Sequence, residues 1–162
     1  MKETPQKIRL GKAAFGQGVF ANHKITLSEH VLTFNGPRLT RAELPKPYGA
    51  VVDHYLQVGP EDYIGPSQAV CDYVNHSCSP NTAIRIEGNE VTLFALQEME
   101  ANSELTFDYS TTMDEDEWEL SCGCGARECR SKVRDFKKLP REIQQRYIAL
   151  GAVPAYILEG LK

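Results

Sequence analysis

Short stretches of alternating or continuous apolar residues recur along the chain and predict many short β-strands. The clearest are KIRLG (residues 7–11), GVFA (18–21), HVLTF (30–34), EVTLFAL (90–96) and ELTFDY (104–109), with Gly, Asn or Pro residues between them. Apolar and polar residues that alternate over about four to eight positions are typical of a strand with one buried face. We therefore expect a mostly β fold.

One hairpin and one left-handed turn can be placed in this pattern. The stretch IRIEGNEVTLFAL (84–96) predicts two strands that turn at Gly88 and Asn89, because both residue types tolerate positive φ. Asn102, just before ELTF, is the candidate for another left-handed residue.

Helical periodicity is clear only near the C-terminus. In LPREIQQRYIALG (139–151), Pro140 fits the first turn and Gly151 fits the end. Between them, Ile143, Tyr147 and Leu150 share a face. The segment GPSQAVCDYVN (65–75) fits a short helix. Residues 37–66, with prolines at positions 45, 47, 60 and 66, predict an irregular insert.

The composition is that of an ordinary globular protein with one domain. Of the 162 residues, 41% are hydrophobic and 25% are charged. No apolar run approaches the length of a membrane span, and none follows MKETPQKIRL, so we expect neither a membrane segment nor a secretory signal. The expected location is a reducing compartment, which is the cytoplasm, or the nucleus if the source is eukaryotic.

Charge is distributed unevenly, although the net charge of −4 argues against a nucleic-acid partner. Residues 98–119 contain many acids and no Lys or Arg, whereas bases predominate in residues 132–146. The two runs are either solvated faces or an acidic rim for a basic substrate beside a basic C-terminal arm.

The five cysteines suggest metal binding. In a chain without an export signal, cysteines are more typical of free thiols or metal ligands than of disulfides. Cys122, Cys124 and Cys129 crowd into SCGCGAREC (121–129), which has too little apolar content for a core of its own. A tetrahedral zinc site would organise these thiols. Cys71 is expected to be a small buried hydrophobic residue.

Two more motifs are ambiguous when taken alone. FGQGVFA (15–21) offers Gly16 and Gly18 either for a plain turn or for close approach of the backbone to a cofactor. VNHSCSPN (74–81) brings together Asn75, His76 and Cys78, either as a nucleophile with its base or as residues with separate roles.

The order of these pieces is more specific than any one of them. GQGVFA, NHSCSPN, ELTFDY and then C-x-C-x4-C resemble the SET-domain protein-lysine methyltransferases, including their post-SET zinc motif. The resemblance spans about residues 8–130, and the tail resembles the C-terminal extension of small stand-alone SET proteins. It implies short β-sheets with a pseudoknot between the NHSC and FDY segments, few short helices, a post-SET zinc loop and a C-terminal helix. The implied divisions are a SET domain (6–110), a zinc-binding segment (111–131) and a helical extension (132–162).

The resemblance also implies roles for individual residues. The Gly16-Gln17-Gly18 backbone would cradle S-adenosylmethionine, and the catalytic tyrosine would be Tyr109, which also contacts the cofactor. Asn75 and His76 would complete the cofactor contacts. Zinc would be held by Cys78, Cys122, Cys124 and Cys129.

Phe34 and Phe107 would line the substrate channel. A tyrosine at the position of Phe107 tends to restrict the product to monomethyl-lysine, so phenylalanine implies di- or trimethyl-lysine. Phe34 stands where many members have tyrosine, Asp72-Tyr73 stands where Arg-Phe is common, and Gln17 is not aromatic. These departures leave the substrate open.

The implied function is methyl transfer from S-adenosylmethionine to a lysine in a basic segment of a protein, such as a histone-like tail, with neither nucleic acid nor membrane as a direct partner. Two rivals stay open. One is a catalytically silent SET fold that grips a basic peptide, and the other is a zinc-structured scaffold without a ligand. Trp118 could cover the adenine, line the peptide groove or only pack.

Overall fold

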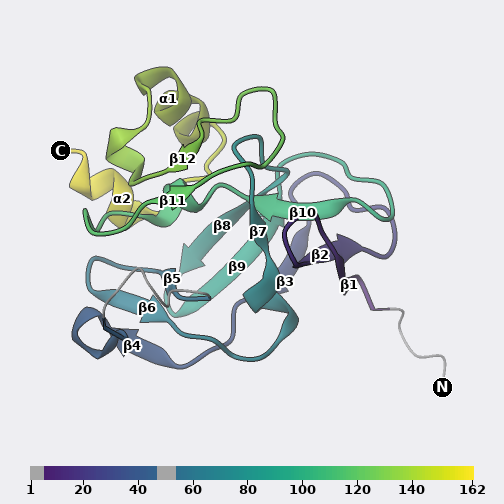
Figure 1. Cartoon of the computed structure of the whole chain (residues 1–162), viewed down its shortest axis with the longest axis horizontal. Helices are drawn as coiled ribbons and strands as arrows, with labels where there is room; N and C mark the ends of the chain where they lie inside the picture. Colours follow the sequence, from purple (N-terminus) through teal and green to yellow (C-terminus); the bar gives the residue numbers. More distant parts are fainter. Residues whose placement is uncertain (1–5, 47–53) are drawn as a thin grey trace.

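The computed structural model describes residues 6–46 and 54–162, which form a mostly β fold (Figure 1). The strands are β1 (Ile8–Lys12), β2 (Gln17–Ala21), β3 (His30–Thr33), β4 (Arg38–Thr40), β5 (Leu56–Gln57), β6 (Asp62–Ile64), β7 (Asn75–His76), β8 (Thr82–Glu87), β9 (Glu90–Ala95), β10 (Glu104–Phe107), β11 (Leu120–Ser121) and β12 (Lys132–Val133). The helices are η1 (Arg41–Glu43), η2 (Val70–Tyr73), η3 (Tyr109–Thr112), η4 (Phe136–Lys138), α1 (Arg141–Ala149) and α2 (Ala155–Gly160). Here η denotes a single 3-10 turn. All five predicted strands form, and η2 is the short helix expected in residues 65–75.

A four-stranded sheet of order β1-β2-β10-β7 joins the N-terminal hairpin to the NHSC and FDY segments. Strands β7 and β10 run parallel, with Thr106 opposite Asn75 and Phe107 opposite His76. The side chain of Asn81 links the two segments, because it donates to the Glu104 carbonyl (2.7 Å) and accepts from the Thr106 amide (2.9 Å). The two motifs implied to pack together are therefore neighbours.

The predicted hairpin is β8–β9, which pairs with β3 in a three-stranded sheet. Its turn uses Gly88 in the left-handed region (φ +59°), while Asn89 does not have a positive φ. Asn102 has φ +70°, as predicted. Alternation gives β9 two apolar faces, because Leu93 packs into the main core and its neighbour Phe94 packs into a second cluster.

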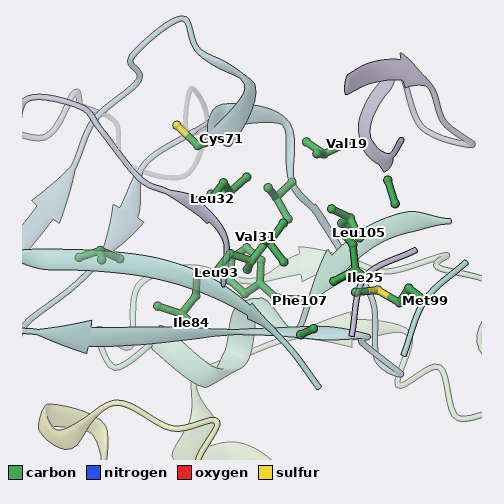
Figure 2. Packing of buried hydrophobic residues seen from close by; sticks show 14 of the residues in the cluster. Val19, Ile25, Val31, Leu32, Cys71, Ile84, Leu93, Met99, Leu105 and Phe107 are labelled. Carbon is green, nitrogen blue, oxygen red and sulfur yellow. The ribbon is translucent and has the colours of Figure 1, made fainter. Parts of the chain in front are cut away.

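The main core lies between the four-stranded sheet and the inner face of the β3-β9-β8 sheet (Figure 2). Val19, Leu105 and Leu93 are fully buried in it. Both the NHSC strand and the FDY strand border this core, so their positions are fixed by apolar packing as well as by backbone pairing.

The C-terminal segment covers the other face of the β8–β9 hairpin, where Phe136, Tyr147 and Ile157 pack against Phe94. Helix α1 begins after Pro140 and ends before Gly151 (φ +63°), as predicted. Leu150, which we place on one face with Ile143 and Tyr147, lies just past the helix end and is 48% exposed. Among the described residues, no helix combines the length and the apolar character that crossing a membrane requires.

The prediction of an irregular insert in residues 37–66 is wrong for the part that the structure describes. Strands β4, β6 and β5 form a three-stranded sheet there, and Thr40 with Glu43 makes a capping box around η1. The strands are two or three residues long, too short for alternation to be recognised in the sequence. Position 47, one of the prolines on which this prediction rests, lies outside the described residues.

The two charged runs pair with each other, an arrangement that neither alternative anticipated. Acidic side chains of residues 114–119 contact basic side chains of residues 132–138. The pairs are Lys137 with Asp114 and Asp116, Lys138 with Asp116, and Lys132 and Arg134 with Glu119. The chain's own cations therefore neutralise much of the acidic run.

Leu105→Ala is expected to lower the free energy of unfolding by about 2–5 kcal/mol, because it empties a fully buried position between β2 and the main core. Urea denaturation followed by circular dichroism measures the change. Leu27→Ala, at a side chain that is 61% exposed, is the matched control and should stay within about 0.5 kcal/mol of the unmutated chain. Equal losses in the two variants would contradict this description of the core.

Candidate active site

A cavity of about 550 Å³ opens between the four-stranded sheet, the insert and the segment that precedes the cysteine cluster. Gly16, Gln17 and Asn75 contribute to its wall, as do Phe34, Phe107 and Tyr109. The insert adds Leu56 and Ile64, and the segment before the cysteines adds Trp118 and Leu120. Most residues singled out from the sequence thus meet in one place.

The glycine turn forms one part of this wall. Gly16 has φ +74°, a conformation that favours glycine, and its carbonyl accepts from the Ala13 amide (2.9 Å). A Cβ atom on Gly18 would lie 2.6 Å from Glu104 Oε1 and 3.1 Å from Asn75 Nδ2. The Asn75 and Glu104 side chains fill the space beside Gly18, because Asn75 Nδ2 donates to both Gln17 O and Glu104 Oε1, each at 2.9 Å. The motif therefore requires glycine at both positions, for different reasons.

Three aromatic rings form another part of the wall. The Tyr109 and Phe107 ring centroids are 4.8 Å apart, and Phe34 meets Phe107 edge to face at 6.4 Å. The Tyr109 hydroxyl donates to the Val74 carbonyl (2.8 Å). This bond fixes the hydroxyl against the residue that precedes β7.

His76 lies behind the wall and not on it. Its Nδ1 accepts from the Tyr109 amide (3.1 Å), and its Nε2 is 3.3 Å from Cys78 Sγ. Burial lowers the pKa of His76 to about 4, so the ring is neutral at pH 7 and can accept through Nδ1. The side chain connects Tyr109 to the cysteine cluster.

The four predicted cysteines come together, and their Sγ atoms all lie within 4.8 Å of one another. Cys122 Sγ is 3.8 Å from Cys78 Sγ and 3.7 Å from Cys129 Sγ. Four thiolates about 2.3 Å from a tetrahedral zinc ion would be about 3.8 Å apart. The donor set and its spacing therefore fit zinc. Cys71 lies outside this group and is buried, as expected.

Two residues outside the family pattern have local contacts. Asp72 accepts from the amides of Ser67 (2.8 Å) and Gln68 (2.6 Å), so its carboxylate holds the loop before η2. The Tyr73 ring lies 5.3 Å from that of His54, and both residues line the cavity.

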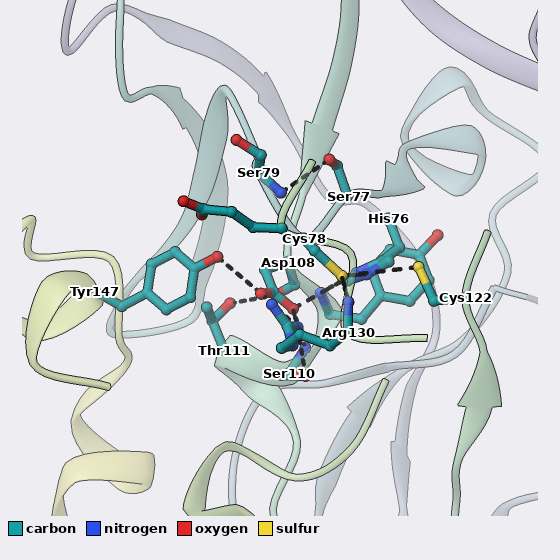
Figure 3. A network of polar contacts seen from close by, with 12 residues as sticks. His76, Ser77, Cys78, Ser79, Asp108, Ser110, Thr111, Cys122, Arg130 and Tyr147 are labelled. Carbon is teal, nitrogen blue, oxygen red and sulfur yellow. Dashed lines mark hydrogen bonds and ion pairs between the residues drawn. The ribbon is translucent and has the colours of Figure 1, made fainter. Parts of the chain in front are cut away.

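Sequence reasoning missed a buried polar network around Asp108, the residue before Tyr109 (Figure 3). Asp108 is 1% exposed and is bound by Arg130 and Tyr147. Glu104, which orients Asn75, was missed as well. Two signals were present in the sequence: Asp108 is the middle letter of FDY, and Arg130 directly follows the last cysteine of the cluster.

A family model described as "SET domain" matches residues 16–110, which is more than half of the chain. The chain belongs to the SET-domain family. This SET domain has the predicted fold, mostly β with few short helices and a cysteine cluster that fits zinc.

Three curated relatives are each 28% identical to this SET domain. They are "Histone-lysine N-methyltransferase 2B" of Homo sapiens (73% of this chain, 5% of the relative), "Histone-lysine N-methyltransferase, H3 lysine-4 specific" of Candida albicans (70% and 12%) and "Histone-lysine N-methyltransferase ATX2" of Arabidopsis thaliana (88% and 14%). The chain therefore spans only a small part of these relatives' length.

Solved structures have the same fold. The crystal structure of KRYPTONITE in complex with mCHG DNA and SAH has a TM-score of 0.65 at 24% identity, over 82% of this chain and 30% of that chain. Arabidopsis thaliana SUVH6 in complex with SAM has a TM-score of 0.66 at 22% identity, over 78% and 32%.

The cysteine cluster predicts one zinc ion per chain. Cys78→Ser should reduce the metal content at least about tenfold, because it removes the one thiolate that the NHSC segment contributes to the cluster. Inductively coupled plasma mass spectrometry of the purified protein measures the metal. Cys71→Ser is the matched control and should retain one ion. Full retention in Cys78→Ser would exclude Cys78 as a ligand.

Proposed function

We propose that this SET domain is an S-adenosylmethionine-dependent methyltransferase that acts on the side-chain amine of a protein lysine. One observation carries the proposal: six of the eight residues expected for the cofactor, the channel and catalysis line one cavity. They are Gly16, Gln17, Asn75, Phe34, Phe107 and Tyr109. The names of the three relatives, all histone-lysine methyltransferases, support the same reaction.

The cofactor would bind at the glycine turn. Gly16 leaves the backbone open to close approach, and the bond from Asn75 to Gln17 O fixes the turn against β7. Because the His76 ring points toward Cys78 and Tyr109, a contact from His76 would come from its backbone. Trp118 lines the same cavity and could cover part of the cofactor.

The chemistry requires a neutral amine and correct alignment. When bound, S-adenosylmethionine supplies a sulfonium methyl group: carbon bonds to the lysine nitrogen, the carbon–sulfur bond leaves its electron pair on sulfur, and the amine's proton passes to water. A free lysine has a pKa of about 10.4, so a neutral amine costs about 4.6 kcal/mol at pH 7. The apolar walls of Phe34 and Phe107 disfavour the ammonium and reduce that cost.

Tyr109 is the proposed catalytic residue. Its hydroxyl proton is donated to Val74 O, so the hydroxyl oxygen serves as an acceptor for the amine N–H and for the polarised methyl group. Its ring packs on Phe107 and its amide is held by His76, which leaves little freedom to the hydroxyl. A fixed geometry of this kind can remove several kcal/mol of entropic barrier.

The substrate is proposed to be a lysine in a basic segment of a protein, and a histone tail is the first candidate. One solved SET structure, KRYPTONITE, contains an H3(1-15) peptide. The pairing of the acidic run with the chain's own bases favours recognition within the cavity over attraction by a broad acidic rim. The proposed compartment follows the substrate: the nucleus for histones, the cytoplasm otherwise.

The decisive experiment incubates the protein with labelled S-adenosylmethionine and, separately, with histones and a cell lysate. Tyr109→Phe should reduce label transfer about a hundredfold or more, because it removes the hydroxyl from the centre of the reaction. Calorimetry should find cofactor affinity changed by less than about fivefold, since the glycine turn and Asn75 stay in place. Cofactor binding without transfer by the unmutated protein would favour a silent peptide-binding module, and no cofactor binding would favour a scaffold.

Phe107 is proposed to leave room for more than one methyl group. The unmutated protein should give di- or trimethyl-lysine under excess cofactor. Phe107→Tyr should accumulate the monomethyl product, because the added hydroxyl narrows the part of the cavity that Phe34 and Phe107 line. Mass spectrometry of the peptide product measures the state. Spectra of the unmutated protein that stop at one methyl group would exclude the proposal.

A further inference from the structure

Asp108, next to the proposed catalytic Tyr109, is the meeting point of three segments (Figure 3). Arg130 Nη2 lies 2.8 Å from Asp108 Oδ1 and 2.7 Å from Oδ2, and the Tyr147 hydroxyl donates to Oδ2 (2.8 Å). The Ser110 amide donates to Oδ1 (3.1 Å). Asp108 itself is 1% exposed. Its carboxylate is therefore in contact with these donors and the nearby His76 ring and is shielded from solvent.

The two side-chain donors come from elements outside the cavity. Arg130 directly follows Cys129, and its amide donates to Cys78 Sγ (3.4 Å), so one residue contacts both the cysteine cluster and Asp108. Tyr147 lies on α1 and is 1% exposed in the C-terminal core. Neither Arg130 nor Tyr147 lines the cavity.

Asp108 in turn fixes the backbone of Tyr109. Its carboxylate caps η3, and its carbonyl accepts from the Thr111 amide (3.0 Å) and hydroxyl (2.7 Å). The Tyr109 amide is bound by His76 Nδ1. The residues on both sides of Tyr109 are thereby held, and a shift of Asp108 would be passed to the Tyr109 ring.

Stability alone does not explain the arrangement. Among the described residues, Arg130 Nε and Nη1 are buried without a hydrogen-bond partner. A buried guanidinium that is only partly paired costs desolvation free energy, which apolar packing of similar volume would avoid. A buried charge of this kind is better explained by a requirement for one defined position of Asp108.

We propose that Arg130 and Tyr147 are positioning residues for methyl transfer: through Asp108 they hold the backbone that presents Tyr109 to the cavity. The inference rests on the proposed function and extends it to the residue after the cysteine cluster and to α1, which act on the reaction without touching substrate or cofactor. The alternative is that the two residues contribute only to global stability.

Tyr147→Phe tests this with the smallest change, because it removes one hydroxyl and keeps the buried ring. The expected result is a kcat about tenfold lower, with KM and the cofactor Kd within about twofold. Ile157→Val is the matched control, since it removes one methylene from the same C-terminal core and leaves the bonds of Asp108 in place. Both variants are assayed where at least about 95% of the protein is folded.

A second readout follows the backbone directly. Amide exchange of Tyr109 and Thr111, measured by NMR, should be at least about fivefold faster in Tyr147→Phe than in Ile157→Val. Equal kcat and equal exchange in the two variants would show that Tyr147 acts through stability alone and would overturn the proposal for it. Exchange needs no turnover, so it decides the positioning claim even if the unmutated protein transfers no methyl group and the proposed function fails.

A double-mutant cycle tests whether Tyr147 acts through Asp108. In an Asp108→Asn background, adding Tyr147→Phe should change kcat by less than about twofold, because the shared link is already broken; independent losses would overturn the route through Asp108. If Asp108→Asn does not fold, the comparison of Tyr147→Phe with Ile157→Val still decides.

Arg130 is tested by conservative rescue. Arg130→Lys keeps a cation within reach of Asp108 and should retain at least about fivefold more kcat than Arg130→Met at equal metal content. Equal kcat values in the two variants would overturn the role of Arg130.

Discussion

The parallel pairing of β7 with β10 is the constraint on which the site depends. It sets Asn75 and His76 beside β10, which ends two residues before Tyr109. Each strand makes only a short pairing, so side chains must reinforce it, and Asn81 does so by bonding to two backbone groups of β10. Without this register the cavity would lose the wall that Asn75, Phe107 and Tyr109 share.

The same pairing explains how one motif serves two sites. Asn75 faces the cavity, while His76 and Cys78 point to its other side, toward the cysteines. Because His76 bonds the Tyr109 amide and contacts Cys78, the cluster and the aromatic wall are linked through a single ring. A change at the cysteine cluster can therefore reach Tyr109 over a short path.

Much of this could be predicted from the sequence, for physical reasons. Some features depend only on residues close together in the sequence, and these were predicted correctly. They are the alternation in the strands, the left-handed residues Gly88 and Asn102, and the end of α1 before Gly151. The order of the motifs predicted that the four cysteines would form one cluster and that residues of the glycine turn, β7 and β10 would line one cavity. The small sheet of the insert could not be found, because β5 has two residues. The Asp108 network was also out of reach: which donors meet a carboxylate 22 and 39 positions away depends on tertiary packing.

The distance in sequence between the parts of the site has a consequence for biosynthesis. A ribosome makes β7 early, but Arg130 and Tyr147 leave it tens of residues later. Until they arrive, Cys78 lacks the other thiols of its cluster and Asp108 is an anion without its cation. The nascent chain can build its β-hairpins in order, yet Asp108 gains the Tyr147 hydroxyl only after α1 has docked. The polar network around Asp108 is thus completed only with α1, and a chain arrested near residue 129 would carry β7 and β10 without Arg130 and Tyr147.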